Sequence, residues 1–158
     1  MKLINVHIGE IKIAKNGEVL KTILGSCVGI GFIWKQKNLC GLAHCLLPET
    51  PVKTFEIGGR YVNQAVPALM AMMKIREENI SEIEVILAGG GNMTNATDEV
   101  AEQLVGSQNI RMALSELQQR GFRIQQNKTG GNEGRKMTIY GTNFSYKIES
   151  IPRIVAAS

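Results

Sequence analysis

The stretch Val19–Trp34, VLKTILGSCVGIGFIW, contains two apolar runs separated by a short Gly-Ser-Cys segment. Runs of about 4–8 apolar and β-branched residues bounded by glycine or polar residues are typical of β-strands. We therefore predict strands at Val19–Leu24 and Val28–Trp34. A polar turn at Lys35–Asn38 precedes a third apolar run, so we predict a further strand at Leu39–Leu47. Cys27 thus lies in the short segment between two of the predicted strands.

Further strand patterns lie on both sides of this region. They are found at Ile4–Ile8, Glu10–Ala14, Ile83–Ala88, Phe122–Gln126, Lys136–Tyr140 and Ser145–Ile151. Lys15–Glu18 contains Asn-Gly, a pair that readily adopts positive φ, so we predict a hairpin-like turn there.

Two segments carry the three- and four-residue apolar spacing that is typical of helices. The first extends from Arg60 to about Lys74, where Pro67 indicates either a kink or a later start of the helix. The second covers Gln108–Gln119, with Ser107 as its N-cap and Gly121 as its C-terminal stop. Because strands come in runs and helices are inserted late, the sequence predicts an α/β fold, a layered sandwich of mixed or antiparallel sheets with packed helices.

The length of 158 residues fits one domain, which we expect to cover residues 1–158. The net charge of +4 is spread along the chain and aromatic residues make up 5%, so we expect no nucleic-acid partner. A basic surface nevertheless suits an acidic protein partner. No apolar run reaches the ~18 residues of a membrane span, and the N-terminus alternates like a strand. We therefore expect a cytoplasmic protein without membrane insertion.

The chain contains three cysteines, Cys27, Cys40 and Cys45, and this odd number favours reduced thiols over a disulfide framework. Cys40, His44 and Cys45 are close in sequence, but their spacing differs from C-x2-C and the chain has no second ligand pair. We therefore expect neither a metal nor a cofactor.

Cys27 and His44 are the candidate catalytic pair, because both lie beside glycines where predicted neighbouring strands end or bend. A thiol becomes a strong nucleophile when an imidazole removes its proton. Gly25 and Gly29 allow the backbone to turn beside Cys27, and amide N–H groups there are natural oxyanion donors. The hydroxyl of Ser26 or Thr22 could hold the imidazole or a substrate amide. The alternative is a buried structural cysteine beside an ordinary core histidine.

These residues belong to a series of motifs that resembles the CheD family of chemoreceptor glutamine deamidases. The signature comprises Leu24–Val28, Gly41–His44 and Leu47–Glu49. Four later motifs follow in order: Gly59–Val62, Gly89–Met93, Gly106–Asn109 and Gly130–Lys136. The likeness spans roughly residues 9 to 150.

The resemblance implies a cysteine hydrolase that converts glutamine side chains in the cytoplasmic helices of chemoreceptors to glutamate. Cys27 would attack the amide carbon, and His44 would protonate the departing ammonia and then activate water. The resemblance also implies the cysteine hydrolase fold of deamidating toxins of the cytotoxic necrotizing factor type. A further implied partner is a CheC-type phosphatase of the response regulator, whose binding occludes the deamidase site. The rival interpretation is a CheD-like interaction module that binds such a phosphatase or receptors with weak or no deamidation.

The family's third catalytic residue is a threonine upstream of the cysteine, six positions before it in some members. Here that position is Lys21, whereas Thr22 lies five positions before Cys27. In a strand, a shift of one residue moves a side chain to the opposite face. Either a bulge restores Thr22 or another group orients the base, and we assign the role to Thr22.

The predicted substrate-binding residues are Ser26, Gly25, Gly90, Asn92 and Arg135. Glycine-lined rims suit an enzyme that admits a glutamine projecting from a long helix, and Arg135 would meet acidic groups beside that glutamine. The alternative is that the glycines of these loops only make tight turns.

Overall fold

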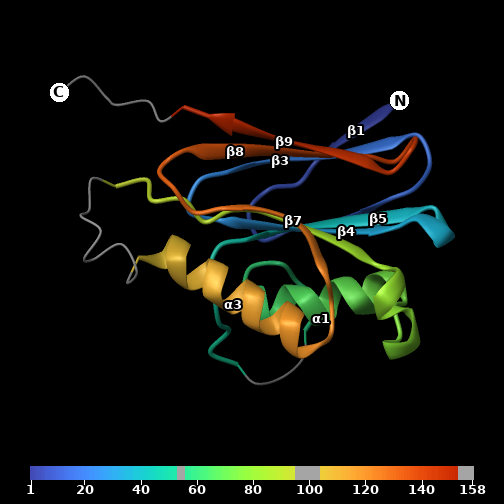
Figure 1. Cartoon of the computed structure of the whole chain (residues 1–158), viewed down its shortest axis with the longest axis horizontal. Coiled ribbons are helices and arrows are strands. Elements are labelled where there is room, and N and C mark those ends of the chain that lie inside the picture. Colours follow the sequence, from blue (N-terminus) through green and yellow to red (C-terminus); the bar gives the residue numbers. More distant parts are fainter. Residues whose placement is uncertain (53–55, 95–103, 153–158) are drawn as a thin grey trace.

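The computed structural model describes residues 1–52, 56–94 and 104–152, and its elements form three layers (Figure 1). The first layer is a four-stranded sheet with the order β1 (Lys2–Asn5), β3 (Glu18–Leu24), β8 (Gly134–Tyr140) and β9 (Ser145–Ile151). The second is a five-stranded sheet with the order β2 (Ile11–Ala14), β5 (Leu39–Cys45), β4 (Val28–Trp34), β6 (Glu84–Gly89) and β7 (Ile124–Thr129). The third layer contains the helices α1 (Val62–Met73) and α3 (Val105–Gln119).

Strand directions are mixed in both sheets. The pairs β1–β3 and β6–β7 are parallel and the other pairs are antiparallel. The helices cover the face of the five-stranded sheet that points away from the other sheet (Figure 1). Two 3-10 helices, Lys35–Lys37 and Glu77–Glu82, precede β5 and β6. The predicted layered α/β sandwich of mixed sheets is therefore confirmed.

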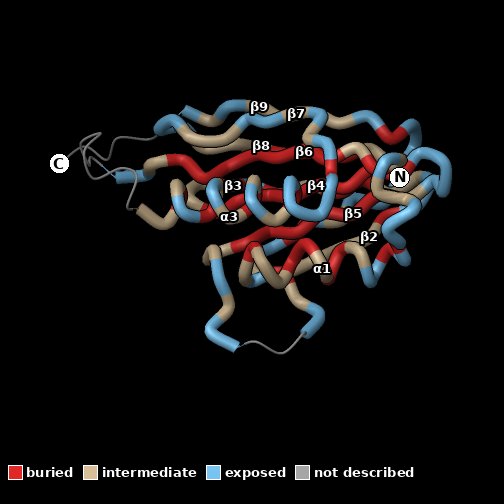
Figure 2. The backbone as a smooth tube through the Cα atoms, turned by 60° about the horizontal axis from the view of Figure 1, so that its bottom comes forward, coloured by how far each residue is buried: buried red, intermediate tan, exposed pale blue. Residues whose placement is uncertain are grey.

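The alternation of side chains along β4 and β5 divides the interior into two cores. Val28, Ile30 and Phe32 belong to the helix-side core, between the five-stranded sheet and the helices. Ile33 on β4 and Leu42 on β5 belong to the inter-sheet core, between the two sheets. Figure 2 shows β4, β5 and β6 buried along most of their length, as expected for the middle of a three-layer structure.

Two glycines on β4, Gly29 and Gly31, let the two sheets approach each other closely. A Cβ added to Gly31 would lie 2.7 Å from Ile86 Cγ1 and 2.9 Å from Ile139 Cδ1 on the opposite sheet. A Cβ added to Gly29 would lie 3.0 Å from Met137 Sδ. The two sheets are thus in contact where a side chain on β4 would hold them apart.

Two local expectations are corrected by the structure, and one alternative that the sequence left open is decided. Helix α3 begins at Val105 after the N-cap Leu104, so Ser107 is not its N-cap. Packing explains the earlier start, because the first turn lies against the carbonyls of Gly90 and Gly91. Helix α1 begins at Val62 and contains Pro67 within it, so the proline does not mark its start.

The second correction concerns Lys15–Glu18. This segment turns, with Gly17 at φ +86°, but it joins β2 in one sheet to β3 in the other. It is therefore a crossing between layers and not a hairpin within a sheet. Across the three described ranges, no helix is both long and apolar enough to span a membrane.

Candidate active site

Cys27 and His44 are brought onto one face of the five-stranded sheet by the pairing of β4 with β5. Gly29 lies opposite His44 and Val28 lies opposite Cys45, so Cys27 directly precedes the first pair of the ladder. Cys27 packs in the inter-sheet core, on the same side as Gly29 and His44. By this register, Cys27 just before β4 and His44 on β5 occupy diagonal positions on one face, and they are 7% and 5% exposed.

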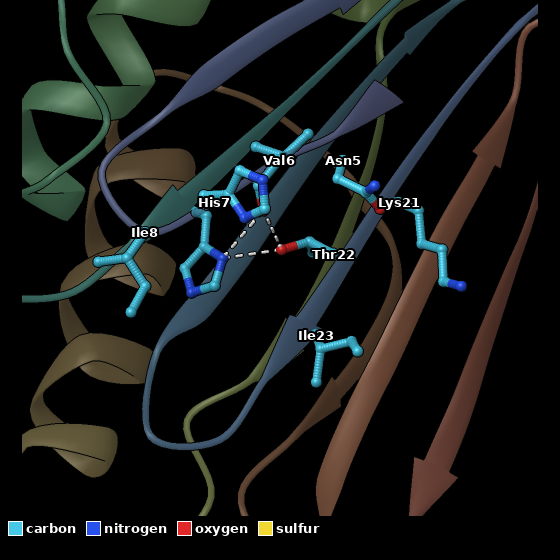
Figure 3. A pocket seen from close by; sticks show the side chains of 8 residues that line it. Asn5, Val6, His7, Ile8, Lys21, Thr22 and Ile23 are labelled. Carbon is cyan, nitrogen blue, oxygen red and sulfur yellow. Dashed lines mark hydrogen bonds between the residues drawn. The ribbon is translucent and has the colours of Figure 1, made fainter. Parts of the chain in front are cut away.

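The imidazole of His44 is oriented by a hydrogen-bond network that connects the two sheets (Figure 3). Thr22 Oγ1 on β3 lies 2.7 Å from His44 Nδ1 and donates its own proton to the carbonyl of Val6 at 2.7 Å. The same carbonyl lies 3.3 Å from His44 Nδ1. Because a carbonyl only accepts, and because the threonine proton is already used, Nδ1 must carry the imidazole proton. Nε2 is therefore the nitrogen left to act as a base.

The strand register explains why Thr22, and not Lys21, meets His44. β3 pairs with β8 without interruption, with Lys21 opposite Thr138 and Thr22 opposite Met137. No bulge is therefore needed, since Thr22 already points inward and is 3% exposed. The structure brings Thr22 and His44 together, while the catalytic role of each remains a prediction.

Burial keeps both members of the pair neutral at rest. Removal from water raises the pKa of the Cys27 thiol above its ordinary value. Burial also lowers the pKa of His44, and the hydrogen bond to the Val6 carbonyl opposes this effect only in part. The site therefore holds a neutral thiol beside a neutral imidazole, and charge separates only during reaction.

The turn that carries the nucleophile is held by its carbonyl groups. Three consecutive carbonyls accept hydrogen bonds from outside the turn: Gly25 from Gly91 N (2.9 Å), Ser26 from Asn109 Nδ2 (3.1 Å) and Cys27 from Gly90 N (2.8 Å). Gly89, at φ +99°, lies so close to the Cys27 carbonyl that a Cβ there would collide with it. The backbone of the nucleophile is thus fixed on three sides.

The predicted substrate-binding residues fall into two groups. Gly25, Ser26 and Gly90 lie in or against the nucleophile turn. Asn92 and Arg135 make hydrogen bonds with residues close to them in the chain: Asn92 Oδ1 accepts from Thr94 N, and Arg135 Nη1, at the start of β8, donates to the carbonyls of Glu133 and Gly134. Arg135 also pairs with Leu24, just before the nucleophile turn. Contact of these five residues with substrate remains a prediction.

Sequence reasoning assigned no role to Asn109 or to the Val6 carbonyl. Asn109 is a polar residue among the apolar positions of its helix, and that conflict is a signal that could have found it. The Val6 carbonyl has no signal, because every residue carries one.

A depression of ≈ 440 Å³ reaches the imidazole from the Thr22 side (Figure 3). Its walls are formed by eight residues, Asn5, Val6, His7, Ile8, Lys21, Thr22, Ile23 and His44. Cys27 does not line it, so the depression borders the pair on the side of the base.

The other two cysteines, Cys40 and Cys45, do not form a site together with His44. Cys45 packs in the helix-side core and Cys40 in the inter-sheet core, so Cys45 and His44 point to opposite faces of β5. Burial raises the pKa of Cys40 to about 12 and raises that of Cys45 further. In the part of the chain that the structure describes, no three His, Cys, Asp or Glu side chains converge as metal ligands.

Comparisons with known proteins show strong similarity to one family. The profile of the family described as "CheD chemotactic sensory transduction" matches residues 46–150. The chain is 42% identical to the probable chemoreceptor glutamine deamidase CheD of Bdellovibrio bacteriovorus, over 94% of this chain and 95% of that protein. It is 40% identical to CheD 2 of a Ruegeria species, over 96% and 93%, and 33% identical to a Methanococcus maripaludis CheD, over 87% and 88%. The alignments are long enough to include both Cys27 and His44.

Proposed function

The chain belongs to the CheD family of chemotactic sensory transduction proteins, and on this premise we propose that it is a chemoreceptor glutamine deamidase. The substrate would be a glutamine side chain on the cytoplasmic helices of a receptor, and the products would be glutamate and ammonia. The observation that carries the proposal is the Thr22–His44 hydrogen bond of 2.7 Å on the face that Cys27 shares. We place the reaction in the cytoplasm, where those helices lie.

The reaction would begin with proton transfer from Cys27 Sγ to His44 Nε2 as the sulfur attacks the amide carbon. The C–N bond then breaks, and the same proton leaves with the nitrogen as ammonia. Water adds to the resulting thioester and gives a proton back to His44. Breakage of the C–S bond releases the glutamate side chain, and the proton on His44 Nε2 returns to the sulfur and restores the thiol.

The network around Nδ1 supports this sequence of proton transfers. When Nε2 takes up the thiol proton, the positive charge on the ring is shared with an Nδ1–H that already faces Thr22 Oγ1 and the Val6 carbonyl. The oxygen of the tetrahedral intermediate would receive a hydrogen bond from the Cys27 N–H, whose peptide is fixed by the contacts of the nucleophile turn.

The depression beside His44 is the proposed place for the receptor segment that flanks the glutamine. Ile8 and Ile23 at its rim are 57% and 62% exposed, which suits the apolar side of an amphipathic helix. Lys21 on the same wall would meet an acidic residue of the substrate. We also propose that the fold is related to that of deamidating toxins, and that a CheC-type phosphatase binds over this site.

The test is a deamidation assay on a receptor cytoplasmic fragment from the same organism, read by mass spectrometry. Wild-type protein should add about 1 Da per converted glutamine, whereas Cys27→Ala and His44→Ala should add none. Cys40→Ala is the matched control, because it removes a buried thiol outside the site and should keep activity. If folded wild-type protein converts no glutamine across a panel of receptors, the deamidase proposal is wrong and the interaction module takes its place.

A further inference from the structure

Asn109 is one of four buried polar side chains in the described ranges, together with Thr22, His44 and Thr138. It lies on α3, whose buried side chains otherwise pack against the five-stranded sheet, and it is 0% exposed. An amide group in such a place is costly unless its hydrogen bonds serve a purpose.

The amide of Asn109 bridges the segments that carry the nucleophile and the base. Nδ2 donates to the carbonyl of Ser26 at 3.1 Å and to the carbonyl of Leu46 at 3.1 Å. Ser26 immediately precedes Cys27, and Leu46 lies two residues after His44. The ladder between β4 and β5 stops at the pair Val28–Cys45, so these two carbonyls lie just beyond it. The side chain therefore continues the connection between the strands where backbone pairing ends.

From these contacts we propose that Asn109 is a positioning residue for the thiol–imidazole pair, an inference that rests on the proposed function. The Ser26–Cys27 peptide is planar, so fixing its carbonyl also fixes the direction of the Cys27 N–H. That N–H is the proposed oxyanion donor, and the adjacent Cα carries the nucleophile. The second hydrogen bond ties this plane to the chain that follows His44.

The oxygen of the same amide, Asn109 Oδ1, has no hydrogen-bond donor among the described residues. Both neighbours of Nδ2 are carbonyls, which only accept, so the NH₂ group must face them and Oδ1 must point away. Oδ1 is also buried away from water. An apolar side chain would avoid this unsatisfied acceptor, so retaining an asparagine makes sense only if its two donors are needed.

The helix that carries Asn109 is itself docked tightly against the nucleophile region. A Cβ added to Gly106 would lie 2.8 Å from the carbonyls of Gly90 and Gly91, whose N–H groups hold Cys27 and Gly25. The first turns of α3 therefore support the turn both through backbone packing and through the Asn109 amide.

The test measures how strongly Cys27 and His44 are coupled, in a reaction that needs no receptor. Alkylation of Cys27 by iodoacetamide is followed by mass spectrometry in wild type, His44→Ala, Asn109→Leu and the double variant. In the wild-type background, loss of His44 should slow the labelling, because the base no longer assists the thiol. In the Asn109→Leu background, the same loss should change the rate by less than about twofold, since misplaced groups no longer interact.

Deamidation kinetics supply the second measurement. Asn109→Leu and the near-isosteric Asn109→Asp should lower kcat by about 100-fold, with KM changed by less than about threefold, because a displacement of ~1 Å at the reacting groups costs that much. Leu117→Ala is the matched control, since it weakens the buried side of the same helix without touching the turn. At a temperature where it is folded, this control should keep both the coupling and kcat.

The outcomes separate the two proposals. If wild type deamidates no receptor, the proposed function fails, yet the alkylation comparison still decides the role of Asn109. If the Asn109 variants are folded and retain the effect of His44→Ala on labelling, the residue is only structural and the inference is overturned. Should Asn109→Leu fail to fold, Asn109→Ser removes the reach of the amide without adding volume and gives the same comparison.

Discussion

The protonation of one imidazole determines how the site works: burial keeps the His44 ring neutral, and a hydroxyl group sets its tautomer. The Thr22 hydroxyl donates a hydrogen bond to the Val6 carbonyl and accepts one from the Nδ1–H of His44. A carboxylate in the same place would add a negative charge and raise the pKa of the imidazole. The neutral hydroxyl orients the ring without adding a charge, so burial still holds the pKa of His44 below its ordinary value and the ring stays available as a base.

We predict that Thr22→Val lowers kcat for deamidation by about 10- to 100-fold, because the ring loses its orienting partner. Val has a similar shape, and Thr22→Ser should stay within a few-fold of wild type because it keeps the hydroxyl. Both rates are measured at saturating receptor fragment and corrected for the folded fraction. Thr138→Val removes another buried hydroxyl and serves as the control. Equal kcat values for Thr22→Val and wild type would contradict the role assigned to the hydroxyl.

The central strands fix the distance between the two sheets through their glycines. Gly31 on β4 faces Ile139 on β8, and no side chain fits between them. The same face of β4 leads to Gly29 and then to the nucleophile. The spacing of the sheets and the geometry of the site are therefore set by one strand.

Gly31→Ala should destabilise the protein by about 1–3 kcal/mol, the usual cost of forcing a methyl group into a packed core. Urea denaturation should show a lower midpoint with an unchanged slope. Gly58→Ala is the control, because the three atoms nearest to a Cβ there belong to the flexible side-chain amide of Gln64, the closest at 3.1 Å. An unchanged midpoint for Gly31→Ala would mean that the sheets can separate without cost.

Local sequence patterns predicted the strands and helices better than they predicted which elements pack or pair with one another. The bounds of Val28–Trp34 and Ser145–Ile151 were predicted correctly, because apolar alternation and flanking turn residues mark such strands in the sequence. The start of α3 was wrong, because tertiary packing holds a first turn that lacks a capping side chain. The crossing at Lys15–Glu18 was misread as a hairpin, since sheet membership depends on distant pairing.

The site shows the same division. Cys27 and His44 stood out through their glycine neighbours, and the resemblance pointed to a threonine. The direct contact of Thr22 with His44 depends on how two sheets stack, and no spacing along the chain encodes that stacking. Asn109 reaches carbonyls 83 and 63 residues away in the chain, so its partners were beyond any local pattern.

For the whole molecule, buried titrating groups limit the pH range of stability on both sides. Burial lowers the pKa of His44 in the folded state, so below about pH 6.5 the unfolded chain binds more protons than the folded one. Stability is therefore present above that pH and decreases as the pH falls. On the alkaline side, burial raises the pKa of all three thiols, so stability decreases as the pH rises above about 8.5.

We predict that the unfolding free energy of wild type falls by up to about 1.4 kcal/mol per pH unit just below pH 6.5. His44→Gln should flatten this dependence between about pH 5 and 6.5, a range chosen because Glu10 and Glu149 have pKa values lowered from 4.5. Urea titrations at several pH values measure the slope. His7 and Glu10 are the titratable neighbours of His44, and His7→Gln is the control for a nearby imidazole. An unchanged slope in His44→Gln would contradict this account.

The segment Gly25–Cys27 is also the crossing by which the chain passes from β3 in one sheet to β4 in the other. Thr22 and His44 therefore belong to different layers and meet only when both sheets have formed and stacked. A chain still emerging from the ribosome has the thiol but not an oriented base. The proposed deamidase site is therefore absent from an incomplete chain, and we expect activity to begin only with the completed fold.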